Sequence, residues 1–252
     1  MGRINIHVAS GNMGAGLSNI PAFPGEGFGL GFPEAVGDVA PGYCFNGLKP
    51  DWRQLEDGAW EQIARAGGEV SYVLTLIPGD DFVDARLSVT NESDRTWESS
   101  FAFNCFQAGA AASIRDNECV RHWCRTGGEF KRLIEIPRQF GPRPTVQLYS
   151  VEGAMPGASI PFVANFQATP ANVALEGWLA LQSRDGRRLV AAVSRPALFV
   201  FQNMEYSCHH SAPCLGPLKP GETGEALTRV YFVEATLEDW HARMCQEMAS
   251  LP

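Results

Sequence analysis

The sequence predicts an all-β fold, a two-sheet antiparallel β-sandwich with one short helix near its C-terminal end. Apolar and polar residues alternate over residues 82–90 with the period of two that marks a half-buried strand. Turn signals separate this run from further apolar runs on both sides. A helical pattern is convincing only at residues 236–248, so the alternation of strands and helices that predicts a parallel α/β fold is missing.

The composition of the chain suits one such domain over residues 1–252. Its 252 residues are 45% hydrophobic, which is enough for a large core, and single sandwiches often reach this length. Residues 11–50 are rich in Gly and Pro, and we interpret them as a long surface excursion anchored by Phe side chains. The glycine-rich run at residues 25–32 resembles a phosphate-binding loop, but no helical pattern follows it.

Each expected strand is an apolar or alternating run bounded by turn residues. In chain order the expected strands are 4–10, 69–77, 82–90, 96–107, 130–137, 145–152, 177–184, 187–194, 197–204 and 226–234. In the run at 82–90, one face is expected to be buried (Val83, Ala85, Leu87, Val89) and the other wet (Asp84, Arg86, Ser88, Thr90). Asp185-Gly186 predicts a hairpin between two apolar runs.

The helix is expected to begin after Thr236, which can cap it together with Asp239. Its apolar stripe consists of Leu237, Trp240, Met244, Cys245 and Met248. We expect this helix to pack on a sheet edge.

The charge balance bears on partners and location. A formal net charge of −8 argues against nucleic acid and against anionic membrane as the main partner. No run approaches the roughly 20 apolar residues of a membrane span, and the first residues lack an apolar signal region, so we expect a cytoplasmic protein. The seven cysteines are odd in number and lack the spacing of a stapled scaffold, which favours reduced, buried thiols.

A first cluster of polar and aromatic residues falls at 104–125. Its candidate substrate-binding residues are Asn104, Gln107, Arg115, Asp116, Arg121 and Trp123, with His122 among them as a candidate acid or base. Sugar sites use this mixture, because aromatic faces pack on the C–H side of a ring while charged and amide groups bind hydroxyls. A polar network at strand ends is the structural alternative.

A second cluster falls at 202–214, at the end of an expected strand. Asn203 is a candidate for substrate binding, and Glu205 with His209 or His210 forms a plausible acid–base pair, since imidazole titrates near neutral pH. Adjacent histidines on an extended chain point in opposite directions, so at most one should face a given pocket. An ordinary polar loop is the structural alternative.

Metal binding is a further alternative. His122, His209 and His210, with Cys119, Cys124, Cys208 and Cys214, supply ligands for a divalent metal, but no paired Cys-x-x-Cys spacing is present. No cofactor is therefore favoured, although a divalent metal remains an open alternative. A cysteine nucleophile lacks a defined His partner, and a serine elbow, a P-loop and a metalloprotease helix are missing from the sequence.

Two stretches resemble a known family. The run from Gly79 to Ser93 and the run from Leu215 to Thr223 are similar to passages of galactose-mutarotase-like β-sandwich proteins. The resemblance implies a carbohydrate cleft on one concave sheet, and the epimerases of this family use histidines and a glutamate. His122, His209 or His210, with Glu205, could match them. The family's first histidine normally follows the asparagine that here is Asn104, and Cys105 stands there instead.

The first functional hypothesis is a carbohydrate-active enzyme acting on a sugar or uronide by His/Glu acid–base chemistry, as an epimerase (an isomerase), a lyase or a hydrolase. Its catalytic residues would be His122, His209 or His210, and Glu205, while Arg115 or Arg121 would hold an anionic or hydroxyl group. The alternatives are a non-catalytic carbohydrate-binding module and a metal-dependent, cupin-like enzyme. The expected partner is a carbohydrate ligand, and self-association into a homo-oligomer is left open.

Overall fold

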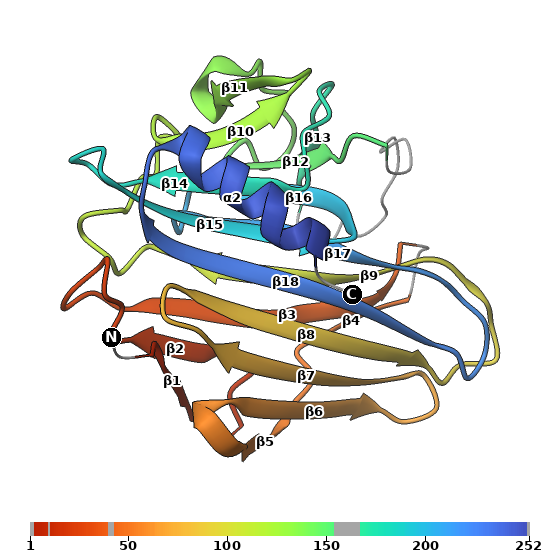
Figure 1. The fold of residues 1–252 in the computed structure, drawn as a ribbon. Coiled ribbons are helices and arrows are strands. Elements are labelled where there is room, and N and C mark those ends of the chain that lie inside the picture. The colour runs from red at the N-terminus through yellow and green to blue at the C-terminus, as the bar shows by residue number, and fades with distance from the viewer. Residues whose placement is uncertain (1–2, 10, 40–42, 154–166, 251–252) are drawn as a thin grey trace.

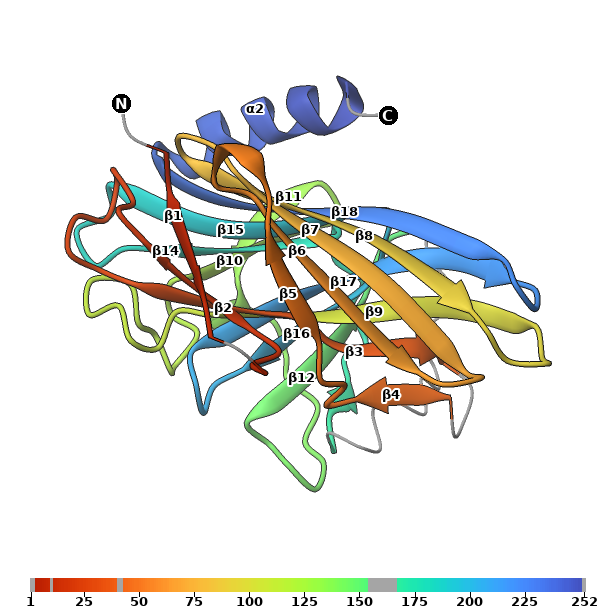
Figure 2. The ribbon, with the colours of Figure 1, turned by 90° about the horizontal axis from the view of Figure 1, so that it is seen from below.

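The computed structural model describes residues 3–9, 11–39, 43–153 and 167–250. Two sheets pack face to face, and helix α2 (Leu237–Ser250) lies on the outer face of one of them (Figure 1). Figure 2 shows the same arrangement from below, with the helix, one sheet and the other sheet as successive layers. The predicted two-sheet sandwich with a C-terminal helix is therefore confirmed.

The sheet farther from the helix is called sheet 1. Its strands, in spatial order, are β1 (Asn5–Val8), β2 (Ala15–Ser18), β3 (Phe28–Asp38), β9 (Trp97–Gln107), β17 (Cys208–Leu218), β16 (Ala197–Asn203), β12 (Val146–Ser150) and β13 (Thr169–Pro170), with β4 (Cys44–Asn46) paired to β3. Its pairs are antiparallel except β12–β13, which is parallel. The strands β9 and β17 lie in the middle of this sheet.

The sheet beneath the helix is called sheet 2. Its strands, in spatial order, are β11 (Glu129–Arg132), β10 (His122–Thr126), β14 (Trp178–Gln182), β15 (Arg188–Arg195), β18 (Thr223–Glu234), β8 (Phe82–Asn91), β7 (Val70–Pro78), β6 (Trp60–Ala66) and β5 (Asp51–Gln54). Short 3₁₀ helices occur at Glu56–Gly58 and Leu133–Glu135. The Asp185-Gly186 turn joins β14 to β15, as predicted, with Gly186 at a φ of +74°.

The main core fills the space between the two sheets. Alternate residues of β8, from Val83 to Val89, are buried in it as the period-two pattern predicted. Three rings from both sheets meet there: the Phe28 centroid lies 5.7 Å from that of Phe106 and 5.1 Å from that of Phe232. Such aromatic contacts add to the free energy that apolar burial supplies.

Helix α2 begins as predicted. The hydroxyl oxygen of Thr236 accepts a hydrogen bond from the backbone N–H of Asp239 at 3.1 Å. The helix packs on the outer face of β14, β15 and β18 rather than on a sheet edge, which corrects our expectation. The reason is that this outer face is itself apolar: Trp240 packs against Trp178 and Tyr231. Cys245 is exposed, outside the buried stripe.

An ion-pair network joins α2 to sheet 2. Asp84, expected on a wet face, is buried, because the helix covers it. Its two carboxylate oxygens accept hydrogen bonds from Arg229 at 2.6 and 2.8 Å. Arg229 also donates to Glu247 of the helix at 2.9 Å, and its guanidinium lies 4.0 Å from the centre of the Phe82 ring. A buried charge of this kind has to be paired in this way.

The glycine-rich stretch at 11–50 is not the surface excursion that we expected. Apart from residues 40–42, which lie outside the described part of the chain, it supplies β2, β3 and β4, and β3 pairs with the central strand β9. Glycine lowers the strand propensity of a sequence, which hid these strands. Their glycines serve close packing instead, as the next subsection shows.

Two further expectations need correction. The stretch 202–214, interpreted as a strand end followed by a loop, contains the long strand β17 after a short turn. The expected strand at 130–137 is only β11 and a 3₁₀ turn. In β17 both faces are buried, so its sequence lacks the alternation that reveals a half-buried strand.

The helices within the described residues include none that is long and apolar enough to cross a membrane.

The ion pair beneath the helix generates a test of stability. We expect Arg229→Met to lower the free energy of unfolding by about 3–5 kcal/mol, because it leaves the Asp84 carboxylate buried without its partner. The double variant Asp84→Val with Arg229→Met should lose less than the single variant, because no unpaired charge then remains. Urea unfolding of both single variants and the double variant measures this. Losses that add to within about 0.5 kcal/mol would contradict the coupling.

Candidate functional site

A cavity of about 770 Å³ opens on the outer face of sheet 1, the face that points away from sheet 2. Strands β3, β9, β16 and β17 form its floor, and Arg143 and Tyr206 reach it from the turns that flank β12 and β17. This volume lies within the range of sites for small molecules. We therefore take this cavity as the candidate functional site.

Alternation along β9 and β17 decides which side chains reach the cavity. On β9, Cys105 and Gln107 point into it, while Asn104 points toward sheet 2 and donates to the Thr228 hydroxyl at 2.9 Å. On β17, Cys208 and His210 line the cavity, while His209 lies between the sheets. The two adjacent histidines thus face opposite sides of one strand, as the extended conformation requires.

Glycines of β3 make room for the cavity floor. A Cβ at Gly29 would lie 2.9 Å from the side-chain oxygen of Gln107, and one at Gly31 would lie 3.3 Å from the Cβ of Cys105. The side chains of Cys105 and Gln107 can therefore lie over β3 because these residues have no side chains. The glycine-rich run is part of the site rather than a cover for it.

A bulge in β3 brings a carboxylate to the cavity. Gly31 pairs with Cys105 and Ala35 with Phe103, so four steps along β3 match only two along β9. The extra residues break the regular pairing, and a bulge of this kind re-aims side chains. Glu34 lies in this segment and lines the cavity, with its Oε2 atom 4.0 Å from Nε2 of His210.

His210 is held firmly with one ring nitrogen available. Its Nδ1 atom lies 3.1 Å from the backbone carbonyl of Phe201, to which it donates, and its Nε2 atom faces Glu34. The ring stacks on Phe103 with centroids 4.3 Å apart. Burial lowers the pKa of His210, but Cys105, Glu34 and the Phe201 carbonyl raise it above its ordinary value.

Further polar groups of the cavity include an arginine and two amides. Arg143 forms a two-pronged ion pair with Glu205, at 2.8 Å from Nε to Oε1 and 2.5 Å from Nη2 to Oε2. Glu205 also accepts from the Thr145 hydroxyl, and the bonds from Arg143 and Thr145 lower its pKa to about 2. Glu205 is thus a fixed anion beside Arg143. Gln107 and Asn203 line the cavity as well.

Two thiols complete the floor. Cys105 and Cys208 are buried and reduced, and both line the cavity beside His210. A hydrogen bond with Cys208 and burial raise the pKa of the Cys105 thiol well above its ordinary value.

The remaining candidate histidines lie between the sheets. His122 is completely buried, with Nδ1 3.1 Å from an oxygen of Asp116. Burial raises the pKa of Asp116, but hydrogen bonds from His122 and from the Arg121 backbone lower it to about 2. The rings of His122 and His209 are 6.0 Å apart. Since His210 is on the opposite face of β17, these three histidines do not meet around one point.

The other candidates of the first cluster form a polar network outside the cavity. Arg121 donates to the backbone carbonyls of Ile114 and Gln182 as well as Arg115. Arg115 donates to Asn117, and the Trp123 indole donates to the side chain of Gln182 at 3.2 Å. Of the residues singled out from sequence, the structure brings Gln107, Asn203, Cys208 and His210 into the cavity.

Sequence reasoning missed Glu34, Arg143, Phe103, Phe201 and Cys105 as cavity residues. Glu34 lay in a stretch interpreted as an excursion, and Arg143 lies in a Pro-rich connection without a motif. One signal could have found the others. Alternate residues of the runs 101–107 and 199–203 are aromatic or polar on both faces, which indicates strands that are covered on both sides.

Comparisons with known proteins found similar solved structures at low sequence identity. No protein-family model matches the chain, and no curated protein matches it. A solved structure of a putative aldose 1-epimerase from Escherichia coli K12 is 13% identical, covers 93% of this chain and 100% of its own, and has a TM-score of 0.47. A galactose mutarotase related enzyme from Lactobacillus acidophilus is 10% identical, with 93% and 98% covered and a TM-score of 0.46.

A galactose mutarotase-like protein from Lactobacillus casei is 9% identical, with 91% of this chain and all of its own covered and a TM-score of 0.44. Because one fold hosts many functions, the chemistry of the cavity has to be argued from its own residues.

The buried histidine between the sheets generates a prediction on pH. Burial, and then the neighbouring His122 and His210, lower the pKa of His209 well below its ordinary value. The unfolded chain takes up a proton on His209 near pH 6.5, whereas the folded chain does so only at much lower pH. Its contribution to stability is therefore present above about pH 6.5 and is lost as the pH falls below that value.

Between about pH 6.5 and 5, the unfolding free energy of the wild type should fall as the pH falls. We expect this slope to be smaller in His209→Leu, by up to about 1.4 kcal/mol per pH unit. Urea unfolding of wild type and variant at several pH values measures the two slopes. Parallel slopes would show that His209 titrates alike in the folded and unfolded chain.

Proposed function

We propose that the chain binds a carbohydrate in the cavity of sheet 1 and transfers protons on it with His210 and Glu34. One observation carries the proposal: an imidazole nitrogen and a carboxylate oxygen lie 4.0 Å apart in a cavity of about 770 Å³ that also has aromatic walls. Both groups belong to the types that act in general acid–base catalysis.

The walls of the cavity support a sugar as the ligand. Tyr206, which is exposed, presents an aromatic face on which the C–H face of a sugar ring can pack, while the buried Phe103 and Phe201 keep the floor of the cavity apolar. Gln107 and Asn203 offer amide groups to hydroxyls. A few placed polar groups in a largely apolar pocket are typical of sites that orient a small ligand.

The hydrogen bonding of His210 supports the proton-transfer role. Because Nδ1 donates to the Phe201 carbonyl, the proton that His210 gives up or gains is the one on Nε2. That atom faces Glu34. In the proposed step the Glu34 carboxylate accepts the proton of the anomeric hydroxyl, and Nε2–H of His210 delivers a proton to the ring oxygen. The C–O bond of the cyclic hemiacetal breaks, and reclosure on the other face returns both protons.

The Arg143–Glu205 pair supports a neutral sugar over a uronide. Arg143 lines the cavity, but the charge of Glu205 balances it at hydrogen-bond distance. An anionic substrate would compete with Glu205 for the guanidinium. The proposed substrate is therefore a neutral aldose.

We expect His210→Gln and Glu34→Gln each to lower the rate of anomer interconversion by roughly 100- to 10,000-fold while the ligand affinity changes little. NMR exchange spectroscopy on a panel of neutral aldoses and uronates, with a metal chelator present, measures the rate. Calorimetry measures the affinity. His241→Gln on helix α2, far from the cavity residues, is the matched control and should keep the wild-type rate.

Retained turnover in both variants would refute the assignment of the acid and the base. Binding by the wild type without any turnover would identify a non-catalytic carbohydrate-binding module. Absence of binding by every sugar of the panel would overturn the proposal.

The balanced arginine gives a second test, on selectivity. We expect Glu205→Gln to strengthen uronate binding relative to the matching neutral aldose, because it removes a negative charge beside Arg143. The gain should be severalfold, on the order of 1 kcal/mol or less, since the two side chains are 29% and 32% exposed. Thr145→Val removes a hydrogen bond to Glu205 without changing the charge, so it is the control. An equal change in affinity for the uronate and the neutral aldose would contradict the proposal that Glu205 balances the charge of Arg143.

A further inference from the structure

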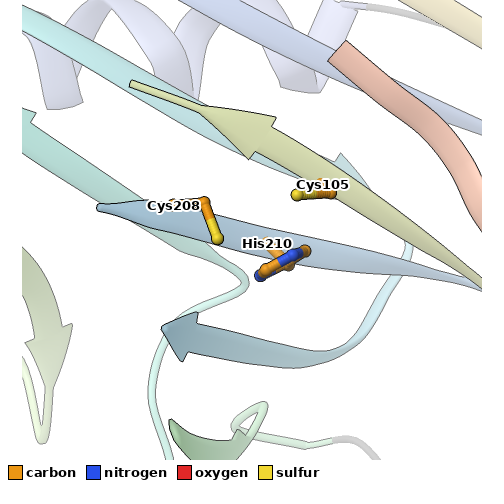
Figure 3. A group of neighbouring side chains, drawn as sticks. All are labelled: Cys105, Cys208 and His210. Carbon is orange, nitrogen blue, oxygen red and sulfur yellow. The ribbon is translucent and has the colours of Figure 1, made fainter. Parts of the chain in front are cut away.

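Three metal-ligating side chains meet at the floor of the cavity. A sulfur each from Cys105 and Cys208 and a ring nitrogen of His210 all lie within 4.8 Å of one another. Figure 3 shows them on neighbouring strands, Cys105 on β9 and the other two on β17. They are the one such group among the described residues. We propose that they bind a single zinc-class divalent ion.

The strand register builds this group. Cys105 pairs directly with His210, and Cys208 lies two residues away on the same face of β17. Since alternate residues share a face, the ladder itself holds the three ligands on one side of the sheet. Both strands are central in sheet 1 and are paired on both edges. A metal site on such strands is positioned more precisely than one on loops.

The distances are close to what zinc requires. With Zn–S bonds of about 2.3 Å and Zn–N bonds of about 2.0 Å, tetrahedral ligand atoms lie roughly 3.5 Å apart. The present separations of up to 4.8 Å can contract by small rotations of the two cysteine side chains. The ring of His210 is already oriented. The Phe201 carbonyl fixes its tautomer through Nδ1, which is the outer-shell contact that orients metal-ligating histidines.

The charges also match. Two thiolates balance the charge of a divalent ion, so the buried floor of the cavity gains no net charge when the ion binds and both thiols lose their protons to solvent. Two cysteines and a histidine are a known ligand set of zinc sites that keep an open position. Here the open position would face the cavity, on the side of Glu34, whose carboxylate is 4.0 Å from Nε2 of His210.

Bound metal has a consequence for the proposed function, and this step alone rests on that function. The ion would take the Nε2 lone pair, which is the atom assigned to proton transfer. The metal-loaded and the catalytic states then exclude each other, so zinc would inhibit sugar turnover at one equivalent.

Cobalt titration of the reduced, metal-free full chain tests the site without any sugar. We expect one equivalent of Co²⁺ to produce thiolate-to-cobalt charge-transfer absorption together with the intense visible bands of tetrahedral cobalt, and Zn²⁺ to displace it. Cys105→Ser, Cys208→Ser and His210→Gln should each weaken binding on the order of 100-fold or more, since each removes a ligand. Cys214→Ser changes a cysteine of the same strand outside the group and should bind as wild type does.

A second measurement needs no variant, in case a substitution prevents folding. Zinc should protect Cys105 and Cys208 of the wild-type chain from alkylation, while the exposed Cys245 still reacts, as read by peptide mass spectrometry. No thiolate band at stoichiometric cobalt, or an undiminished band in both serine variants, would overturn the proposal. Because both readouts are independent of sugar, a protein that binds metal but turns over no sugar would refute only the proposed function.

Discussion

The alternation of side chains along β9 and β17 is the constraint on which the rest of the structure depends. Both strands are central in sheet 1, and both of their faces are covered, by sheet 2 on one side and by the cavity walls on the other. Neighbouring residues therefore enter different surroundings. His209 joins Phe106 in the interior between the sheets, while His210 reaches the cavity. A register shift of one residue would exchange these roles, which makes the pairing of these strands decisive for function.

The glycines and the bulge of β3 create the space and position the carboxylate that complete the site on this face. Without side chains at Gly29 and Gly31, the neighbouring strand can fill the space above β3 with Gln107 and Cys105. The extra residues between Gly31 and Ala35 then bring Glu34 to the rim opposite His210. A regular strand with larger residues would close this space. Glycine at positions 29 and 31 lowers the strand propensity of β3, but it allows the side chains of the neighbouring strand to lie close to the β3 backbone.

The sequence predicted those elements whose signal is local. The alternation at 82–90, the Asp185-Gly186 turn and the Thr236 cap each depend on a few neighbouring residues, and each is confirmed. Strand β17 was not predicted. Both of its faces are buried, so its sequence does not alternate, and its cysteine, histidine and serine residues were interpreted as a polar loop. The same holds for the site. His210 was identified from its own chemistry, which is a local signal. Glu34 was missed because it lies far from His210 in sequence and only strand pairing brings the two together.

The chemistry of the cavity converges on one atom, Nε2 of His210. The other ring nitrogen, Nδ1, donates to the Phe201 carbonyl, so a proton, a metal ion and a substrate hydroxyl that donates a hydrogen bond would all compete for the same Nε2 lone pair. Two groups bias that competition in opposite directions. Glu34 favours a proton there, since a carboxylate stabilises an imidazolium. The thiols of Cys105 and Cys208 favour a thiophilic ion, but only while they are reduced and can release their protons. In the two proposals the acid–base pair and the metal-ligand set share one histidine, and the state of the two cysteines would decide which of them the protein can use.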